Sequence, residues 1–334
     1  MQIDTVLPPT SLNQVADLAK AAEEIGFDTL WSAETQHDPF LPMALISQNT
    51  QRLQMGTAVA IGFARSPANL AYTSWDLAEA SGGRFILGLG TQVKAHIERR
   101  FGMPWPESPV GKFREMIQAI RAFWKAWQTG ERLNFRGRYF KHTLMSPFFN
   151  PGPIPHPEIP IYIAGVNTGL CRLAGELADG FHVHPYHSKG YLQEVVLPSI
   201  EGGLGSANRG REELALSVTA LAASDLDEKE FIRSQISFYA STPTYRPVMA
   251  HHGWGEVADQ LRNLSRKGEW AEMPTLITEE MLEIFATIAS RGELAAAMKE
   301  RYAGIADRIT LYLPYLPGER DDFWRRFVSE MHTT

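Results

Sequence analysis

Cysteine is almost absent from this chain of 334 residues, which contains a single one, Cys171. One cysteine cannot form an intramolecular disulfide, and it cannot supply the ligands of a multi-cysteine metal site. The surrounding stretch TGLCRLAGELA has the apolar spacing of a helix, so we expect Cys171 to be a small buried core residue. The sequence therefore excludes folds that depend on disulfide bonds or on zinc held by several cysteines.

Long apolar runs and an excess of positive charge are also missing. No stretch approaches the roughly 18 continuous apolar residues of a membrane-spanning helix. The first residues, MQIDTVLPPT, lack the basic start and apolar core of a secretory signal. Lysine and arginine number 32 against 38 aspartate and glutamate, a formal net charge of -6, whereas nucleic-acid binders usually carry a basic excess. We expect a cytoplasmic protein whose partner is a small molecule, with no nucleic acid and no membrane.

Familiar catalytic signatures are missing as well. The Gly-x-Gly of GLGTQ is not followed by the Gly-Lys-Ser/Thr of a P-loop, and no Gly-x-Ser-x-Gly nucleophile elbow occurs. His182 and His184 would share one face of a strand, as paired metal ligands do in some hydrolase barrels. Those barrels take their paired histidines from the first strand, and IDTVL offers none. We expect no metal site, and a metal-dependent hydrolase is the weakest alternative.

The chain does contain a regular alternation of short apolar segments and helical patterns. Eight segments are predicted strands: residues 3–7, 28–34, 53–61, 84–90, 159–165, 180–184, 214–224 and 307–313. The fourth, RFILGLG, is almost continuously apolar, which is typical of parallel strands covered on both faces. Eight strands alternating with helices predict an α/β fold, a (β/α)8 TIM barrel. An open doubly wound sheet is the alternative.

Two predicted helices carry clear end signals. Ser11 and Gln14 have the spacing of a capping box, and Gly26 suits the C-terminal end of the same helix. Ser66 is the expected N-cap of another helix, with Pro67 at its first position. The stretch AVAIGFARSP therefore predicts a strand that passes almost directly into a helix.

Two stretches interrupt the alternation, residues 130–158 and residues 241–278. The first stretch and the beginning of the second are rich in proline, glycine and aromatic residues. We interpret both as insertions at the rim of a single domain that spans residues 1–334. Aromatic residues available to an apolar substrate pocket are Trp105, Phe148, Phe149, Tyr245 and Trp254.

Functional groups of a barrel of this kind collect where strands end and loops begin. In this chain those positions hold Glu34 and His37, Ala58 and Val59, Gly90, Thr91 and Gln92, Gly165, Asn167 and Thr168, and His182 and His184. The segment AGVNTG opens a helix, and the free N–H groups and positive dipole end of a helix N-terminus suit a phosphate.

The order and spacing of these segments resemble the bacterial luciferase-like oxidoreductases, parallel eight-stranded barrels that use flavin or deazaflavin. The resemblance runs through IDTVLP, LWSAETQHDPF, GTAVAIGFARSP, GGRFILGLGTQ, IYIAGVNTG and LADGFHVHP. SAETQHDPFLP and GLGTQVKAHIERRFG are most similar to the branch that uses coenzyme F-420, an 8-hydroxy-5-deazaflavin. Thr35 and Gln36 stand where the luciferase branch has two histidines, which speaks against flavin monooxygenase chemistry. FMN is the alternative cofactor.

The resemblance implies roles for individual residues. The Ala58–Val59 peptide is expected to be cis and to form a bulge behind the cofactor ring. Cofactor contacts are implied for Ala58, Val59, Gly90, Thr91 and Gln92 at the ring and its ribityl chain, and for Gly165, Asn167 and Thr168 at the phosphate. His37 is the implied general acid/base, Glu34 its orienting or substrate-binding partner, and His184 a reserve. Candidate contacts for the acidic cofactor tail are Arg65, Lys94, Arg99 and Arg100.

The resemblance also implies the activity. We expect an oxidoreductase that transfers a hydride between coenzyme F-420 and a small organic substrate, and that forms a homo-oligomer, a dimer or tetramer. An FMN-dependent luciferase-like monooxygenase and a non-catalytic deazaflavin-binding paralogue are the alternatives.

Overall fold

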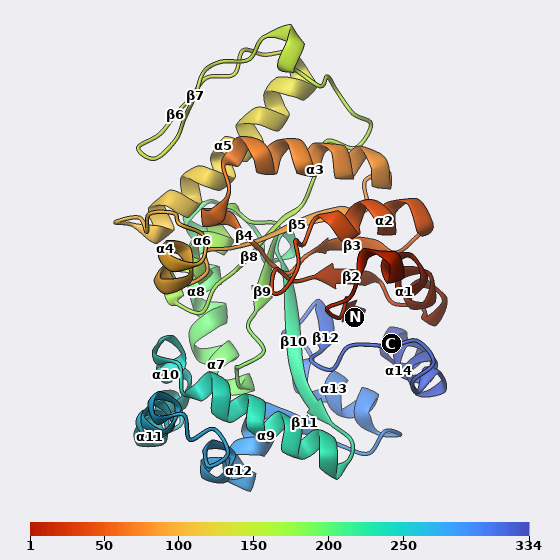
Figure 1. Cartoon of the computed structure of the whole chain (residues 1–334), viewed down its shortest axis with the longest axis vertical. Helices are drawn as coiled ribbons and strands as arrows, with labels where there is room; N and C mark the ends of the chain where they lie inside the picture. Colours follow the sequence, from red (N-terminus) through yellow and green to blue (C-terminus); the bar gives the residue numbers. More distant parts are fainter. Residues whose placement is uncertain (334) are drawn as a thin grey trace.

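The computed structural model describes residues 1–333, and eight of their strands close into a parallel barrel (Figure 1). In barrel order the strands are β1 (Gln2–Val6), β2 (Thr29–Ser32), β3 (Gln54–Thr57), β5 (Phe85–Gly90), β8 (Ile161–Ala164), β9 (Gly180–Val183), β10 (Ala215–Ala223) and β12 (Arg308–Leu311). β12 pairs with both β10 and β1, and β10 also pairs with β9, so the ring has no open edge. The predicted TIM barrel is confirmed, and the open sheet is wrong.

Helices surround this ring and bury their apolar faces against it (Figure 1). Those that follow barrel strands or cover them are α1 (Leu12–Ile25), α2 (Leu41–Asn49), α3 (Pro67–Ser81), α4 (Lys94–Arg99), α5 (Pro109–Thr129), α6 (Thr168–Leu177), α8 (Leu197–Ser206), α9 (Leu226–Ala240), α13 (Leu294–Tyr302) and α14 (Asp321–His332). None of the helices in the described part of the chain has the length and apolarity needed to cross a bilayer.

The third predicted strand is divided in two. β3 ends at Thr57, and β4 (Ala60–Ile61) resumes the pairing with β5 after a cis peptide bond between Ala58 and Val59. Gly56 pairs with Ile86 but Ala60 pairs with Leu89, so β3 and β4 together hold one residue more than the facing stretch of β5. The expected cis peptide and bulge are confirmed.

The helix-end predictions have mixed outcomes. Ser66 caps α3 as expected, because its Oγ accepts a hydrogen bond from the Asn69 N–H at 3.1 Å. Gly26 ends α1 with φ of 103°. The capping box at α1 is wrong, since the Ser11 side chain makes no capping bond. The Gln14 side chain is instead engaged by the hydroxyl of Thr10.

The two interrupting stretches differ in structure. Residues 130–158 form the small hairpin of β6 (Phe135–Arg136) and β7 (Lys141–His142), which projects beyond α5 in Figure 1. Residues 241–278 are mostly helical, with α10 (Arg246–His251) and α11 (Gly255–Lys267). The following α12 (Glu279–Phe285) leads into β11 (Ala286–Ile288), which extends the sheet from β10 outside the ring.

A buried ion pair lies inside the barrel, near the amino ends of the strands. Asp4 of β1 and Arg308 of β12 are 1% and 3% exposed, and Arg308 Nε donates to Asp4 Oδ2 at 2.9 Å. Trp31 Nε1 donates to the same oxygen at 2.9 Å, and Gln54 Oε1 accepts from Arg308 at 3.1 Å. The pair therefore links four neighbouring strands. A separate apolar cluster of Trp31, Ile86 and Tyr162 lies apart from the outer core.

We expect Asp4→Asn to lower the free energy of unfolding by about 3–5 kcal/mol, because it leaves the Arg308 charge buried without a partner. Asp4→Leu combined with Arg308→Met removes both charges and should recover most of that loss. Urea denaturation measures both effects. The matched control is Asp259→Asn, which breaks an exposed pair with Arg246 and should leave the midpoint nearly unchanged. A single variant as stable as wild type would contradict the role of the pair.

Candidate functional site

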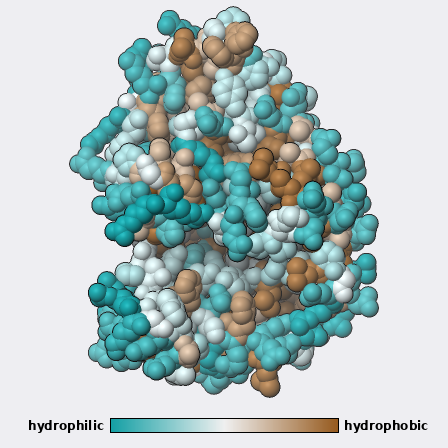
Figure 2. Space-filling view, in the orientation of Figure 1, coloured by the Kyte–Doolittle hydropathy of each residue, from teal (hydrophilic) through white to brown (hydrophobic). Residues whose placement is uncertain are grey.

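A cavity of about 440 Å³ opens at the carboxyl ends of the barrel strands. Its walls come from the ends of β5, β8 and β9, from the bulge between β3 and β4, and from the segment before α10. In Figure 2 the surface is hollowed between the level of α4 and the level of α10, and less hydrophilic side chains line the hollow. This is the end of a barrel where functional groups converge.

Seven of the eight predicted cofactor-binding residues line this one cavity: Ala58, Val59, Gly90, Thr91, Gln92, Gly165 and Asn167. The eighth, Thr168, is the first residue of α6 and directly follows the lining, with an exposed side chain. These residues are up to 110 positions apart in the sequence, and the closure of the barrel brings them together.

Two glycines of the cavity lining are packed tightly against neighbouring side chains. A Cβ on Gly90 would lie 2.6 Å from Val59 Cγ2, and a Cβ on Gly165 would lie 2.4 Å from Leu170 Cβ. Gln92 beside them has φ of 58°, a left-handed conformation that is uncommon for a residue with a side chain. Its Oε1 accepts a hydrogen bond from the Val93 N–H at 2.9 Å. A shaped, close-fitting wall results.

The N-terminus of α6 lies at the same wall. Asn167 is the N-cap, and its Oδ1 accepts a hydrogen bond from the Leu170 N–H at 2.9 Å. The N–H groups of Thr168 and Gly169 belong to the first turn, where no carbonyl of the helix can accept from them. Together with the positive dipole end they form a site suited to a phosphate.

Glu34 and Arg65 explain why an arginine follows the apolar stretch AVAI. Glu34 Oε2 accepts hydrogen bonds from the Ile61 N–H at 2.7 Å and from Arg65 Nη1 at 2.5 Å. Arg65 Nη2 also donates to Asp38 at 3.1 Å. The pair therefore ties the loop after β2 to β4, just beyond the bulge. Arg65 is paired with two carboxylates, so its charge is not free to bind the acidic cofactor tail.

His37 lies outside the cavity lining. It is exposed on the loop between β2 and α2, and its ring makes no hydrogen bond to any of residues 1–333. Among the other predicted cations, Lys94 lies at the cavity mouth, 3.8 Å from Glu98. Arg100 donates to the Thr35 carbonyl at 2.7 Å. Arg99 is exposed at the end of α4.

His182 reaches the cavity from the inner face of β9. Its ring meets Trp31 edge-on, with centroids 4.8 Å apart, and only 8% of the residue is exposed. Within residues 1–333 its buried Nε2 has no hydrogen-bond partner. Burial lowers the pKa of His182 to about 3, so the ring is neutral at physiological pH. His182 thus contributes a neutral ring to the cavity lining, and its Nε2 is sealed from solvent and unpaired within residues 1–333.

His184 and Tyr245 form a pair at the side of the cavity. His184 Nε2 lies 2.9 Å from Tyr245 Oη, the rings stack at 4.4 Å, and Tyr239 packs edge-on against the imidazole. The backbone N–H of Tyr186 donates to His184 Nδ1 at 3.1 Å. Burial lowers the pKa of His184 to about 3 and raises the pKa of Tyr245 to about 12. The two residues are 61 positions apart, so their pairing could not be read from the sequence.

The aromatic predictions are partly right. Trp105 and Tyr245 line the cavity. Phe148 and Phe149 are exposed on the projecting segment, Phe148 by 88%, and Trp254 packs against Phe285 instead. Phe148 and Phe149 belong to a segment that folds away from the barrel mouth, and composition could not indicate this.

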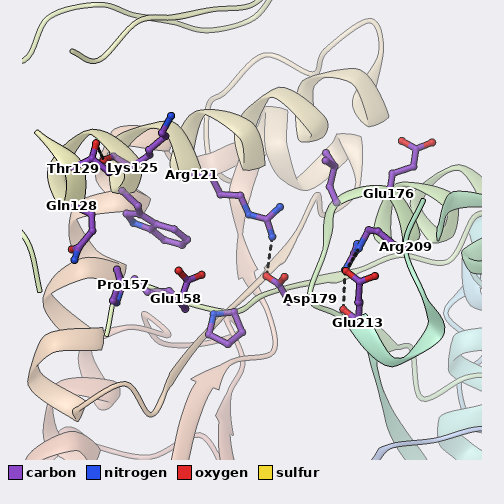
Figure 3. Close-up of a pocket in the computed structure, with 14 residues that line it drawn as sticks. Arg121, Lys125, Gln128, Thr129, Pro157, Glu158, Glu176, Asp179, Arg209 and Glu213 are labelled. Atoms are coloured by element: carbon purple, nitrogen blue, oxygen red, sulfur yellow. Dashed lines mark hydrogen bonds and ion pairs between the residues drawn. The ribbon is translucent and has the colours of Figure 1, made fainter. Parts of the chain in front are cut away.

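A second hollow, of about 680 Å³, lies at the opposite end of the barrel strands. It is lined by residues that precede β8, β9 and β10 and by the second half of α5 (Figure 3). Two ion pairs lie in its wall, Arg121 with Asp179 at 2.9 Å and Arg209 with Glu213. The described residues show no group of three histidine, cysteine, aspartate or glutamate side chains that could hold a metal ion. The carboxyl-end cavity is therefore the candidate site.

Comparison with known proteins agrees with this geometry. The luciferase-like monooxygenase family model matches residues 2–308. An uncharacterised protein of Mycobacterium tuberculosis is 44% identical over 307 residues, 90% of each chain. A 5,10-methylenetetrahydromethanopterin reductase of Archaeoglobus fulgidus is 28% identical over 88% of this chain and 87% of its own. The structure of the coenzyme F-420-dependent tetrahydromethanopterin reductase of Methanopyrus kandleri superposes with a TM-score of 0.80 at 21% identity, over 98% and 97% of the two chains.

We expect acid to destabilise the fold through the buried histidines. The pKa values of His182 and His184 are lowered to about 3 and that of His187 to about 4, below the ~6.5 of an unfolded histidine. Below about pH 6.5 the unfolded chain binds protons that the folded chain does not, so stability is lost as pH falls. The expected loss is about 1.4 kcal/mol per pH unit for each histidine.

Urea denaturation between about pH 7 and about pH 5 measures this dependence. His184→Gln should reduce the slope, whereas His96→Gln on the exposed face of α4 should leave it unchanged. Equal slopes in wild type and His184→Gln would contradict the assignment of a neutral, buried imidazole.

Proposed function

This chain belongs to the luciferase-like monooxygenase family, and we propose on that premise that it is an oxidoreductase that binds coenzyme F-420 in the carboxyl-end cavity. The proposed reaction transfers a hydride between the deazaflavin and a small organic substrate. The observation that carries the proposal is the convergence of seven resemblance-implied cofactor residues on the wall of a single cavity, with the N-terminus of α6 beside them.

The chemistry of the cavity fits a flat ring joined to a phosphate. Gly90 and Gly165 have no room for a side chain beside Val59 and Leu170, so these two positions contribute only backbone atoms to the wall. The neutral ring of His182 adds an uncharged surface to the same lining. The free N–H groups of Thr168 and Gly169 would hold the phosphate. When bound in its reduced form, the deazaflavin supplies a hydride from a ring carbon.

Two observations favour the deazaflavin over FMN. Thr35 and Gln36 replace the two histidines implied for the flavin-dependent branch. The relatives from A. fulgidus and M. kandleri are named as a methanopterin reductase and as a coenzyme F-420-dependent enzyme. Titrating the apoprotein with each cofactor and following fluorescence quenching tests the choice. Tighter binding of FMN would overturn it in favour of the FMN-dependent monooxygenase, and cofactor binding without any turnover would favour the non-catalytic paralogue.

We expect the double variant Asn167→Leu, Thr168→Leu to bind the cofactor about ten- to a hundredfold more weakly, because it removes the side-chain donors of Asn167 and Thr168 beside the phosphate and one charge-assisted hydrogen bond is worth roughly 1.5–3 kcal/mol. Fluorescence quenching by the deazaflavin measures the affinity. The matched control is Thr278→Leu, which removes the N-cap of α12 and does not touch the cavity. Unchanged affinity in a folded double variant would move the phosphate elsewhere.

The role of His37 as general acid/base stays a prediction. If His37 holds this role, His37→Ala should slow single-turnover hydride transfer by about 10²–10⁴-fold in folded, cofactor-saturated protein, which is the contribution of a positioned acid/base. Cofactor affinity should change little, since the ring lies outside the cavity lining. A variant that transfers hydride at nearly the wild-type rate would remove His37 from the mechanism.

Two further expectations concern the setting of the protein. We propose a homo-oligomer, because the exposed apolar side chains of Leu144, Phe148 and Phe149 offer a surface that a second copy could cover. Light scattering measures the mass in solution. The cytoplasmic location stays a prediction from the sequence.

A further inference from the structure

The interior of the cavity carries no charge at neutral pH. Lys94 is the one charged residue of its lining within residues 1–333, and its side chain is 65% exposed at the mouth, beside Glu98. His182 and His184 are uncharged because burial lowers both pKa values to about 3. An anionic substrate group would therefore find no buried cation to pair with, and burying it unpaired is costly. The inner cavity suits an uncharged substrate.

The hydrogen bonds of His184 determine which ring nitrogen carries its proton. Nδ1 accepts from the Tyr186 backbone N–H, so this nitrogen is unprotonated. A neutral imidazole has one proton, which must therefore be on Nε2. Nε2–H then donates to Tyr245 Oη at 2.9 Å.

This tautomer leaves the Tyr245 hydroxyl hydrogen without an acceptor. Oη accepts from His184, and no other hydrogen-bond partner reaches Oη among residues 1–333. Tyr245 lines the cavity, and within residues 1–333 no group accepts a hydrogen bond from its O–H. Stacking on His184 at 4.4 Å and the edge contact of Tyr239 hold the two rings in place.

We propose that Tyr245, positioned by His184, and not the exposed His37, is the hydrogen-bond donor and proton donor to the carbonyl oxygen of an uncharged ketone or aldehyde substrate. The inference rests on the proposed function for its source of hydride. The carbonyl carbon accepts the hydride that reduced deazaflavin supplies, the C=O π pair moves to oxygen, and that oxygen takes the proton of Tyr245 Oη. The tyrosinate left behind accepts the His184 Nε2–H bond until solvent returns a proton. In the reverse direction an alcohol gives up the same proton and hydride.

Neighbouring tyrosines do not offer the same group. The hydroxyl of Tyr239 is bonded to Tyr312 Oη at 2.9 Å, and Tyr312 in turn donates to Gln235. Tyr186 is 2% exposed and outside the lining of the main cavity. Tyr239→Phe is therefore a matched control, because it contacts the same imidazole but carries no hydroxyl toward the cavity.

The first test uses acetophenone as the probe and needs no cofactor. Its carbonyl stretch, measured by infrared difference spectroscopy, should shift to lower frequency on binding to the wild-type protein. Tyr245→Phe should abolish the shift, His184→Phe should weaken it, and Tyr239→Phe should retain it. A shift that persists in Tyr245→Phe, or failure of acetophenone to bind the wild type, would overturn the inference.

A charged analogue tests the substrate class. Benzoylformate presents a similar ketone with a carboxylate attached, and it should bind at least about tenfold more weakly than acetophenone, which corresponds to roughly 1.4 kcal/mol. Equal or tighter binding of benzoylformate would overturn the assignment of an uncharged substrate.

Single-turnover reduction of acetophenone by the deazaflavin-loaded protein tests the proton transfer. Tyr245→Phe should slow the step by about 10²–10⁴-fold while deazaflavin affinity stays nearly unchanged. A wild type that binds both molecules but transfers no hydride, or a variant at the wild-type rate, would overturn the proton transfer. If deazaflavin fails to bind while the infrared shift depends on Tyr245, the proposed function fails and the hydrogen-bond donor stands. If deazaflavin binds but the infrared shift does not depend on Tyr245, the proposed function stands and the hydrogen-bond donor fails.

Discussion

The buried Asp4–Arg308 pair is the contact on which the rest of the barrel interior depends. It joins the first and last strands of the ring, and through Trp31 and Gln54 it also reaches β2 and β3. Such a pair contributes little net energy compared with apolar packing, but removing one partner is costly because the other charge is then buried and unpaired. The lumen above it is filled by Trp31, Ile86 and Tyr162, and the cavity begins where this filling ends.

At the mouth of the barrel a second ionic contact, between Glu34 and Arg65, joins the loops that follow β2 and β4. Glu34 holds both the Ile61 N–H and Arg65, and it anchors the chain immediately after the bulge at residues 58–59. Gly90 contributes only backbone atoms to the cavity wall at this point, and the Val59 side chain packs directly against it.

Burial then decides the chemistry of the titratable groups. His182 and His184 would titrate near neutrality in water, but inside the barrel both are neutral. A neutral imidazole with one nitrogen bonded to a backbone N–H has a single possible donor, and His184 directs that donor at Tyr245. The same desolvation that makes these histidines sensitive to acid also converts them into fixed hydrogen-bonding groups. His37 is exposed and outside the cavity lining, so no hydrogen bond within residues 1–333 fixes its ring.

The sequence by itself determined the barrel, because strand and helix periods are local properties of neighbouring residues. It also determined the Ser66 cap and most of the cavity wall, since parallel strands place their carboxyl ends together. Only the tertiary structure decided which groups pair across long separations: Asp4 with Arg308, Glu34 with Arg65, and His184 with Tyr245. The Gln14 side chain shows the same limit at short range, because it bonds to the Thr10 hydroxyl and does not complete the predicted capping box with Ser11. Pairings of this kind depend on where the closed ring brings side chains, and no local pattern carries that information.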